Sequence, residues 1–239
     1  MKNGDKLIRL NKYISNAGLC SRRKADELIQ QGFISVNENV VKEVGTKVKP
    51  TDKVKYKGNL LSIEKKIYLV LNKPKNYITT VKDRYAEKNV MELLQGACNE
   101  RVYPVGRLDK NTTGVLLFTN DGDLAKKLTH PKYNKKKIYH VFLDKDISQI
   151  YLNQILKGIE LEDGFIKADA ISYVKNNKSQ IGIEIHSGKK RIVRRIFQYF
   201  DYEIKQLDRV YFAGITKKNL PKGKWRFLTN EEIRLLKYF

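Results

Sequence analysis

Hydrophobic residues follow a helical spacing near the start of the chain and a strand-like spacing further along it. Leu10, Tyr13, Ile14 and Ala17 recur at i, i+3, i+4 and i+7, which predicts an amphipathic helix that ends at Gly18. Later in the chain the apolar residues stand in short runs bounded by turn-forming residues, as is typical of strands. The pattern therefore predicts a helical beginning followed by a sheet-rich segment.

The rest of the first segment adds a second helix and a small sheet. Ser21 can cap a helix through its hydroxyl group. Strands at residues 34–36 and 40–41 flank a turn-forming segment and predict a hairpin, and a further short strand is expected around Val54. Residues 1–62 are therefore interpreted as a compact α/β module.

A second core is predicted over residues 63–239. It begins with the apolar run 67–71, which turn-forming residues stop. Further strands are expected at 101–105, 115–119, 137–142 and 181–185, and helices at 123–128 and 191–199. Because strands outnumber helices, this segment is predicted to be an α+β domain.

The charge of the chain narrows the class of partner. Lys and Arg number 48 against 26 Asp and Glu, a net charge of +22, which favours a polyanionic partner such as nucleic acid over an anionic membrane surface. Charge does not separate DNA from RNA. No window approaches the roughly 18 apolar residues of a membrane span, and the two cysteines form no Cys-x-x-Cys pair. We therefore expect a cytoplasmic protein without a zinc site, a disulfide or any other metal site.

The start of the second helix carries a basic cluster. Ser21, Arg22, Arg23 and Lys24 would place three cations beside helix N-terminal N–H groups that attract anions, which predicts a phosphate-binding site. The alternative is a solvated basic turn.

This first segment resembles the S-four RNA-binding domain. The similarity lies in residues 10–15, Gly18, 21–26 and 34–37. The domain occurs in enzymes and non-enzymes alike, so the resemblance implies RNA binding and no chemistry.

The loop 106–114, GRLDKNTTG, is the most informative polar segment of the second core. It lies between two apolar strands, and rigid strands commonly hold the loops that carry chemistry. Asp109 stands there between Arg107 and Lys110, which would keep its carboxylate ionised as a nucleophile or base. An Asx-type turn is an equally good reading of an Asp beside Asn and Thr, and residue chemistry alone leaves both open.

Residues 106–109 and 112–117 resemble the catalytic motif of RNA pseudouridine synthases of the RsuA/RluB type. Further matching segments keep their order along nearly the entire chain: 72–74, 120–122, 129–131, 137–141 and 188–195. The resemblance implies a synthase domain on a mixed, mainly antiparallel sheet. It also implies isomerisation of a uridine in ribosomal RNA without a cofactor.

The resemblance assigns roles to single residues. Asp109 matches the essential carboxylate, and Arg194 matches the arginine that pairs with it. Tyr139 matches the tyrosine that stacks on the extracted base and is proposed to help remove the C5 proton; a core aromatic is the alternative. Arg107 is our candidate for filling the space that the base vacates, and Arg191 for binding phosphate.

The last motif, 188–195, departs from the group: it has Ile192 in place of Gln, and Lys189 and Lys190 in place of Arg-Asn. The departure bears on local RNA contacts and leaves the match of Arg194 unchanged. Six lysines are further candidates for phosphate contacts: Lys132, Lys135, Lys136, Lys137, Lys189 and Lys190.

The expected partner is a structured ribosomal RNA hairpin with a flipped uridine. Residues 18–23 and 223–229 resemble enzymes that act on the large subunit more than those that act on the small one, so we expect large-subunit RNA. The expected oligomeric state is a monomer. The rival hypotheses are a non-catalytic RNA-binding protein and a dimeric DNA reader.

Overall fold

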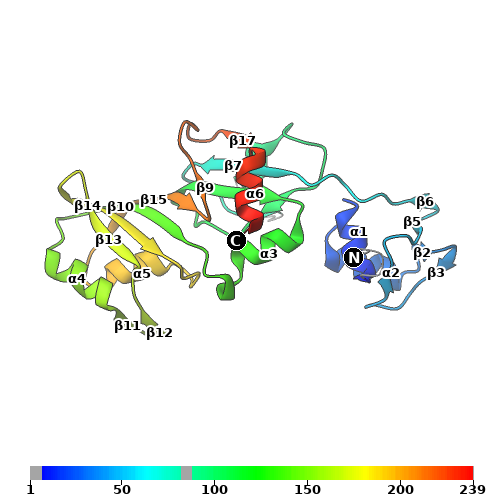
Figure 1. Ribbon diagram of the computed structural model, residues 1–239, viewed down its shortest axis with the longest axis horizontal. Helices are drawn as coiled ribbons and strands as arrows, with labels where there is room; N and C mark the ends of the chain where they lie inside the picture. The colour runs from blue at the N-terminus through cyan, green and yellow to red at the C-terminus, as the bar shows by residue number, and fades with distance from the viewer. Residues whose placement is uncertain (1–6, 82–87, 239) are drawn as a thin grey trace. The chain divides into compact units, whose positions relative to one another are not determined.

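The computed structural model describes residues 7–81 and 88–238 (Figure 1). The chain divides into two compact units, 1–66 and 67–239, and each is described by itself. Within the described ranges no helix combines the length and the apolar character needed to cross a membrane.

The first unit consists of two helices and two small antiparallel sheets (Figure 1). One sheet has the order β3-β2-β5-β6, and the other pairs β1 with β4. The elements are β1 (Ile8–Arg9), α1 (Leu10–Asn16), α2 (Arg22–Gln30), β2 (Ile34–Val36), β3 (Asn39–Val40), β4 (Lys47–Val48), β5 (Val54–Tyr56) and β6 (Asn59–Leu60).

Local sequence accounts for this unit. The Ser21 hydroxyl accepts a hydrogen bond from Lys24 N over 3.2 Å and so caps α2. Asn37 and Glu38 both have positive φ, 48° and 69°, which gives the tight turn that joins β2 to β3. The predicted helices and hairpin are confirmed, whereas the β1–β4 pair was not predicted, since two-residue strands carry no periodicity.

The second unit is built on one nine-stranded sheet with the order β13-β14-β10-β15-β9-β7-β17, where β16 adds to β15 and β8 to β9. Its strands are β7 (Tyr68–Lys73), β8 (Tyr103–Pro104), β9 (Thr112–Thr119), β10 (Lys137–Leu143), β13 (Ala170–Val174), β14 (Asn177–Ile185), β15 (Ile204–Phe212), β16 (Ile215–Thr216) and β17 (Trp225–Phe227). Only β15 and β9 pair in parallel, so the sheet is mixed and mainly antiparallel, as the resemblance implied. A separate hairpin joins β11 (Ile159–Leu161) to β12 (Gly164–Ile166).

The helices of this unit are η1 (Glu92–Leu94), α3 (Gly122–Thr129), η2 (Pro131–Tyr133), α4 (Gln149–Lys157), α5 (Ile192–Gln198) and α6 (Asn230–Tyr238), and all except η2 contribute buried residues to its cores. Strands β7 and β9 are buried along their whole length, because α3 and α6 contribute to the core on one side and η1 to a second core on the other. Burial on both faces explains why their sequences are nearly continuous apolar runs.

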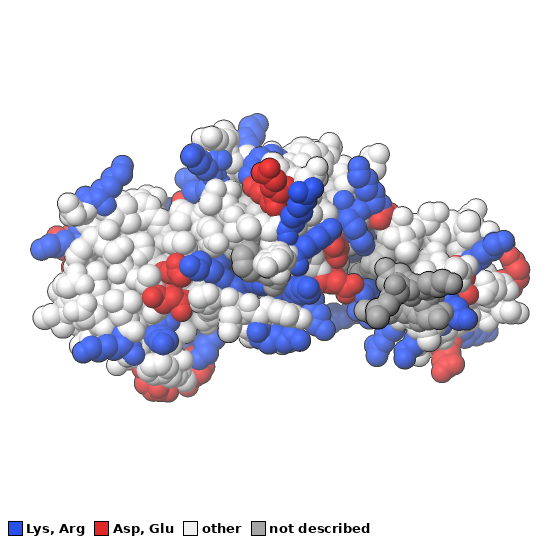
Figure 2. Space-filling model, viewed as in Figure 1, with Lys and Arg blue, Asp and Glu red and all other residues white. Residues whose placement is uncertain are grey.

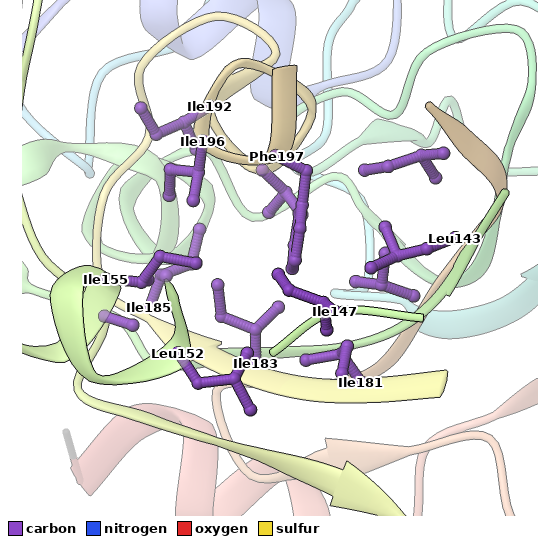
Figure 3. Close-up of a cluster of buried hydrophobic side chains, with 14 of the residues drawn as sticks. Leu143, Ile147, Leu152, Ile155, Ile181, Ile183, Ile185, Ile192, Ile196 and Phe197 are labelled. Carbon is purple, nitrogen blue, oxygen red and sulfur yellow. The ribbon is translucent and has the colours of Figure 1, made fainter. Parts of the chain in front are cut away.

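Strands β10 and β14 are covered by α4 and α5, which pack their apolar residues into one cluster. Figure 3 shows this cluster, in which Ile181, Ile183 and Ile185 of β14 meet Leu152 and Ile155 of α4 and Ile192, Ile196 and Phe197 of α5. Because α5 is fixed by this core, its polar face is fixed as well.

Two predictions for the sheet need correction. The strand expected at 101–105 is limited to Tyr103–Pro104. Strand β15, which lies between β10 and β9 near the middle of the sheet, was missed because charged residues interrupt its apolar pattern.

Candidate active site

Asp109 lies in the loop between β8 and β9. The loop turns at Gly106, whose φ is 75°, and Thr112 N donates to Asp109 O over 3.0 Å at its end. Within the described part of the chain the Asp109 carboxylate accepts no backbone hydrogen bond, and its side chain is 38% exposed. The Asx-turn alternative is therefore not what the structure has, and the carboxylate faces other side chains.

A buried lysine holds this loop by its main chain. Lys73 Nζ donates to the carbonyl oxygens of Asp109, Lys110 and Thr112 over 3.1, 3.1 and 2.9 Å, and to that of Pro74 over 3.1 Å. The side chain is fully buried, and burial lowers the pKa of Lys73 to about 8. In the sequence, Lys73 was part of the matching segment 72–74 but had no predicted role. A lysine at the end of a buried strand is itself a signal of a structural or functional role.

Thr79 fixes the residue just before Asp109. Its Oγ1 donates to Leu108 O over 2.7 Å and accepts from Leu108 N over 3.2 Å. Asn76 N also donates to Lys110 O over 2.9 Å. The backbone on both sides of Asp109 is therefore tied to the segment that follows β7.

Two arginines at the start of α5 reach the Asp109 carboxylate. Arg191 Nη1 lies 3.7 Å and Arg194 Nε 3.8 Å from Asp109 Oδ2. Arg191 adopts a left-handed conformation with φ 52°, and its side chain is half exposed. Arg194 is mostly buried, donates from Nη1 to Ile204 O over 3.5 Å, and has its pKa lowered by burial and by Arg191. The predicted pair of Asp109 and Arg194 is thus present, and Arg191, predicted to bind phosphate, lies beside the same carboxylate.

Asp109 opens into a cavity of about 170 Å³. Arg107, Tyr139 and Arg191 line it together with Asp109, whereas Arg194 does not. Tyr139 comes from β10, and it also packs against the core cluster of Figure 3. Tyr139 therefore both lines the cavity and contacts the core.

Two further cationic residues lie in the cavity wall: Lys137, which was predicted as a candidate for phosphate contacts, and Arg209, which was not predicted. Arg209, on β15 opposite Tyr139, donates from Nε to Val115 O over 2.8 Å, and its guanidinium lies 4.6 Å from the Phe212 ring centroid. Lys137 Nζ donates to Lys135 O and His186 O over 2.9 and 3.0 Å, and burial lowers its pKa to about 8. An arginine within a strand would have been a signal for Arg209. Because strand β15 was not predicted, that signal was not recognised.

The basic cluster of the first unit is partly engaged within the protein. Arg22 donates from Nε and Nη2 to Asn11 Oδ1 over 3.3 and 3.2 Å, and Lys24 Nζ lies 2.6 Å from Glu27 Oε2. Arg23 is exposed. The three predicted phosphate-binding cations are all exposed, and Arg23 is the one of the three without a side-chain partner among the described residues.

Several of the lysines suggested for phosphate contacts are also engaged. Lys136 pairs with Glu184 over 2.7 Å, and Lys189 donates to Asp163 O over 2.7 Å at the tip of the β11–β12 hairpin. Asp163 also forms a two-point contact with Arg195, and this contact lowers its pKa to about 2. The hairpin therefore supports the segment 187–191, which lines the cavity.

Positive charge is widespread on the protein surface, and Lys and Arg outnumber Asp and Glu on the face shown in Figure 2. No group of His, Cys, Asp and Glu suited to a metal ion occurs among the described residues. The cavity itself holds one carboxylate, Asp109, against several cations. A carboxylate beside cations and an aromatic hydroxyl group suits nucleophilic and proton-transfer chemistry.

Comparisons with known proteins agree with this geometry. The model of the RNA pseudouridylate synthase family matches residues 67–199, and that of the S4 domain matches residues 8–54. A solved structure described as a pseudouridylate synthase superposes with a TM-score of 0.68 at 25% identity, over 96% of this chain and 99% of that one.

Named relatives cover nearly the whole chain. An uncharacterized RNA pseudouridine synthase of Aquifex aeolicus is 40% identical over 96% of this chain and 93% of its own length. The ribosomal large subunit pseudouridine synthase B of Bacillus subtilis is 38% identical over 96% of this chain and 95% of its own length. The dual-specificity RNA pseudouridine synthase RluF of Escherichia coli is 34% identical over 96% of this chain and 78% of its own length. The chain therefore belongs to the RNA pseudouridine synthases, a family of isomerases, and carries an N-terminal S4 domain.

Proposed function

We propose that this protein converts one uridine of large-subunit ribosomal RNA into pseudouridine, with Asp109 as the essential carboxylate. The observation that carries the proposal is the placement of Asp109 Oδ2 within 3.7 and 3.8 Å of Arg191 and Arg194, at a cavity that Tyr139 also lines. The name of the Bacillus subtilis relative supports the large subunit as the target, and the net charge of +22 supports an RNA partner.

The reaction breaks the bond between C1′ of the ribose and N1 of the uracil, turns the ring, and joins C1′ to C5. The C5 proton is lost and N1 gains one, so no redox partner or cofactor takes part. Asp109 acts on the anomeric carbon, on the base ring or through a glycal path. Tyr139 stacks on the base and takes part in removing the C5 proton.

A uridine inside folded RNA reaches this cavity only after it leaves its stack, which costs a few kcal/mol. Arg107 fills the vacated space, and Arg191 contributes to phosphate binding. Ser21, the neighbouring Arg22 and Arg23, and Lys24 contact the RNA backbone from the S4 domain. One protein chain suffices, because every residue proposed for catalysis comes from the second unit.

The decisive experiment maps pseudouridine in ribosomal RNA after incubation with wild type, with Asp109→Asn and with Asp146→Asn. Asp109→Asn removes the charge with almost no change of shape, and Asp146, exposed in the turn before α4, is the matched control. One uridine converted by wild type and by Asp146→Asn but spared by Asp109→Asn supports the proposal. RNA binding is measured in parallel, so that the loss is assigned to chemistry.

If wild type binds RNA and converts no uridine in ribosomal or transfer RNA, the non-catalytic RNA-binding hypothesis replaces this one. Competition between a ribosomal hairpin and duplex DNA at equal ionic strength tests the remaining rival. A DNA reader would prefer the duplex, whereas the proposed enzyme prefers the structured RNA.

A further inference from the structure

Arg209 is a buried cation without an anionic partner. Arg209 is only 3% exposed, and its Nη2 atom is buried without a hydrogen-bond partner. Among the described residues no carboxylate forms an ion pair with it; the adjacent Asp208 instead bonds to Thr113 and Lys217. Burial lowers the pKa of Arg209, although an arginine stays protonated at neutral pH.

This arrangement destabilises a fold unless something offsets it, because a charge removed from water needs a partner. Arg209 donates from Nε to Val115 O and lies over the Phe212 ring, and the Tyr139 side chain across the strand pair interacts with its guanidinium by charge and by a hydrogen bond. Its Nη2 nevertheless has no hydrogen-bond partner. The neighbouring cation Lys137 differs, since its ammonium group already donates to two carbonyls. Arg209 therefore holds a buried donor without a partner, on a residue of the cavity wall.

Arg209 is one of the residues that line the cavity, and a cation in this wall matches a demand of the reaction. When C1′–N1 breaks, its electron pair passes to the uracil ring and spreads over the carbonyl oxygens O2 and O4. The pair returns to form C1′–C5, after which C5 loses its proton and N1 gains one. A fixed guanidinium in a cavity with little water stabilises such transient negative charge strongly.

We propose that Arg209 Nη2 donates to a carbonyl oxygen of the extruded uracil and stabilises the negative charge that the ring carries while C1′–N1 is broken. The inference rests on the proposed function, and it adds a catalytic residue that contacts the base rather than the sugar. It also gives a role to a cation of the cavity wall that does not contact Asp109.

The thermal stability of an Arg209 variant separates a catalytic role from a structural one. If Arg209 served only the fold, its replacement would lower the melting temperature strongly. With Arg209→Met we expect a melting temperature within about 3 °C of wild type, because relief of the unpaired charge offsets the lost bond to Val115. Lys137→Met is the matched control, since it removes a satisfied cation from the same cavity and strands two carbonyls, so its melting temperature falls by about 5 °C or more. A large loss of stability in Arg209→Met would overturn the proposal in favour of a structural role.

Ligand binding tests the proposal without any RNA target. The probe is 5-nitrouracil, whose ring is anionic at neutral pH, compared with uncharged thymine by NMR titration. Wild type is expected to bind the anion at least about tenfold more tightly than thymine, and Arg209→Met to lose that preference. Equal binding of both ligands to wild type, or an unchanged preference in Arg209→Met, overturns the proposal even if the enzyme converts uridine.

Single-turnover rates then test the catalytic consequence. We expect Arg209→Met to lower the rate on the target RNA by about 100-fold or more while RNA affinity, which backbone contacts dominate, stays within about threefold. Replacing the target by 5-fluorouridine stabilises the ring anion, so the consumption of that nucleoside should show a smaller defect. An equal defect on both RNAs contradicts charge stabilisation.

Tyr139→Phe separates direct action from action through the tyrosine hydroxyl. If Arg209 contacts the base, Arg209→Met lowers the rate further in the Tyr139→Phe background; if it only positions that hydroxyl, the second change has no added effect. Failure of wild type to convert any uridine refutes the proposed function, and the 5-nitrouracil titration then still decides the role of Arg209.

Discussion

Lys73 holds Asp109 by the main chain and leaves its carboxylate to other partners. The distance from Lys73 Nζ to Asp109 O is 3.1 Å, and the same ammonium group bonds three further carbonyls. The carboxylate of Asp109 instead lies near Arg191 and Arg194. One cation thus sets the course of the loop, and two others lie beside the Asp109 carboxylate.

Lys73→Met is expected to lower the free energy of unfolding by about 2–4 kcal/mol, because it removes the ammonium donor from four carbonyl oxygens, of which only those of Asp109 and Lys110 keep a backbone donor named above. Activity should fall by more than about tenfold at a temperature where the variant is folded, since a small displacement of Asp109 is enough. Chemical denaturation and single-turnover rates measure the two effects. The exposed Lys75→Met is the control, and an active Lys73→Met would refute the clamp.

Arg194 and Arg191 should differ in their effects although both lie near Asp109. Arg194 has 16% of its side chain exposed and Arg191 has 52%, so water and salt screen Arg191 more. We expect Arg194→Gln to lower kcat about 100-fold at any salt concentration. Arg191→Gln should mainly lower kcat/KM, and the size of this loss should decrease as the salt concentration rises. Equal losses with equal salt dependence would contradict this division.

The stability of the protein should rise with pH above about 8 through two lysines. Burial lowers the pKa of Lys73 and of Lys137 to about 8 from an ordinary value of 10.5. Between these values the unfolded chain binds more protons than the folded one, so the free energy of unfolding increases with pH in that interval and the contribution is absent below pH 8.

Denaturation of wild type and Lys137→Met between pH 8 and about 9.5 measures this contribution, before tyrosines titrate. The slope against pH should be smaller in the variant, because one of the two groups is gone. A variant with the slope of wild type would show that Lys137 keeps an ordinary pKa.

Arg23 should contribute to RNA affinity without sequence preference. It is exposed at the start of α2, so Arg23→Gln is expected to weaken binding uniformly and to reduce the slope of log K against log salt by about one. Lys55→Gln is the control in the same unit, because Lys55 already lies 2.7 Å from Glu38 Oε1. Equal effects of both changes would assign the affinity to net charge rather than to the predicted phosphate site.

The sequence by itself determined the features that depend on near neighbours. Helices α1 and α2 follow from apolar spacing and the Ser21 cap, and strands β7 and β9 from runs of apolar residues. Asp109 was identified because its motif is contiguous. In each case the information lies within a window of about ten residues, which is the range of periodicity and turn chemistry.

Only the tertiary structure decided which distant groups meet. The resemblance had paired Asp109 with Arg194, and the structure gives the reason, since α5 packs on the β10–β14 face. Arg209, which was not predicted, enters the cavity wall because β15 lies between β10 and β9. The partner of a charged side chain depends on strand order and on the core that fixes each helix, and neither has a local signature. For this reason the sequence could name the carboxylate, and the fold was needed to find the buried cations, Lys73 and Arg209, that surround it.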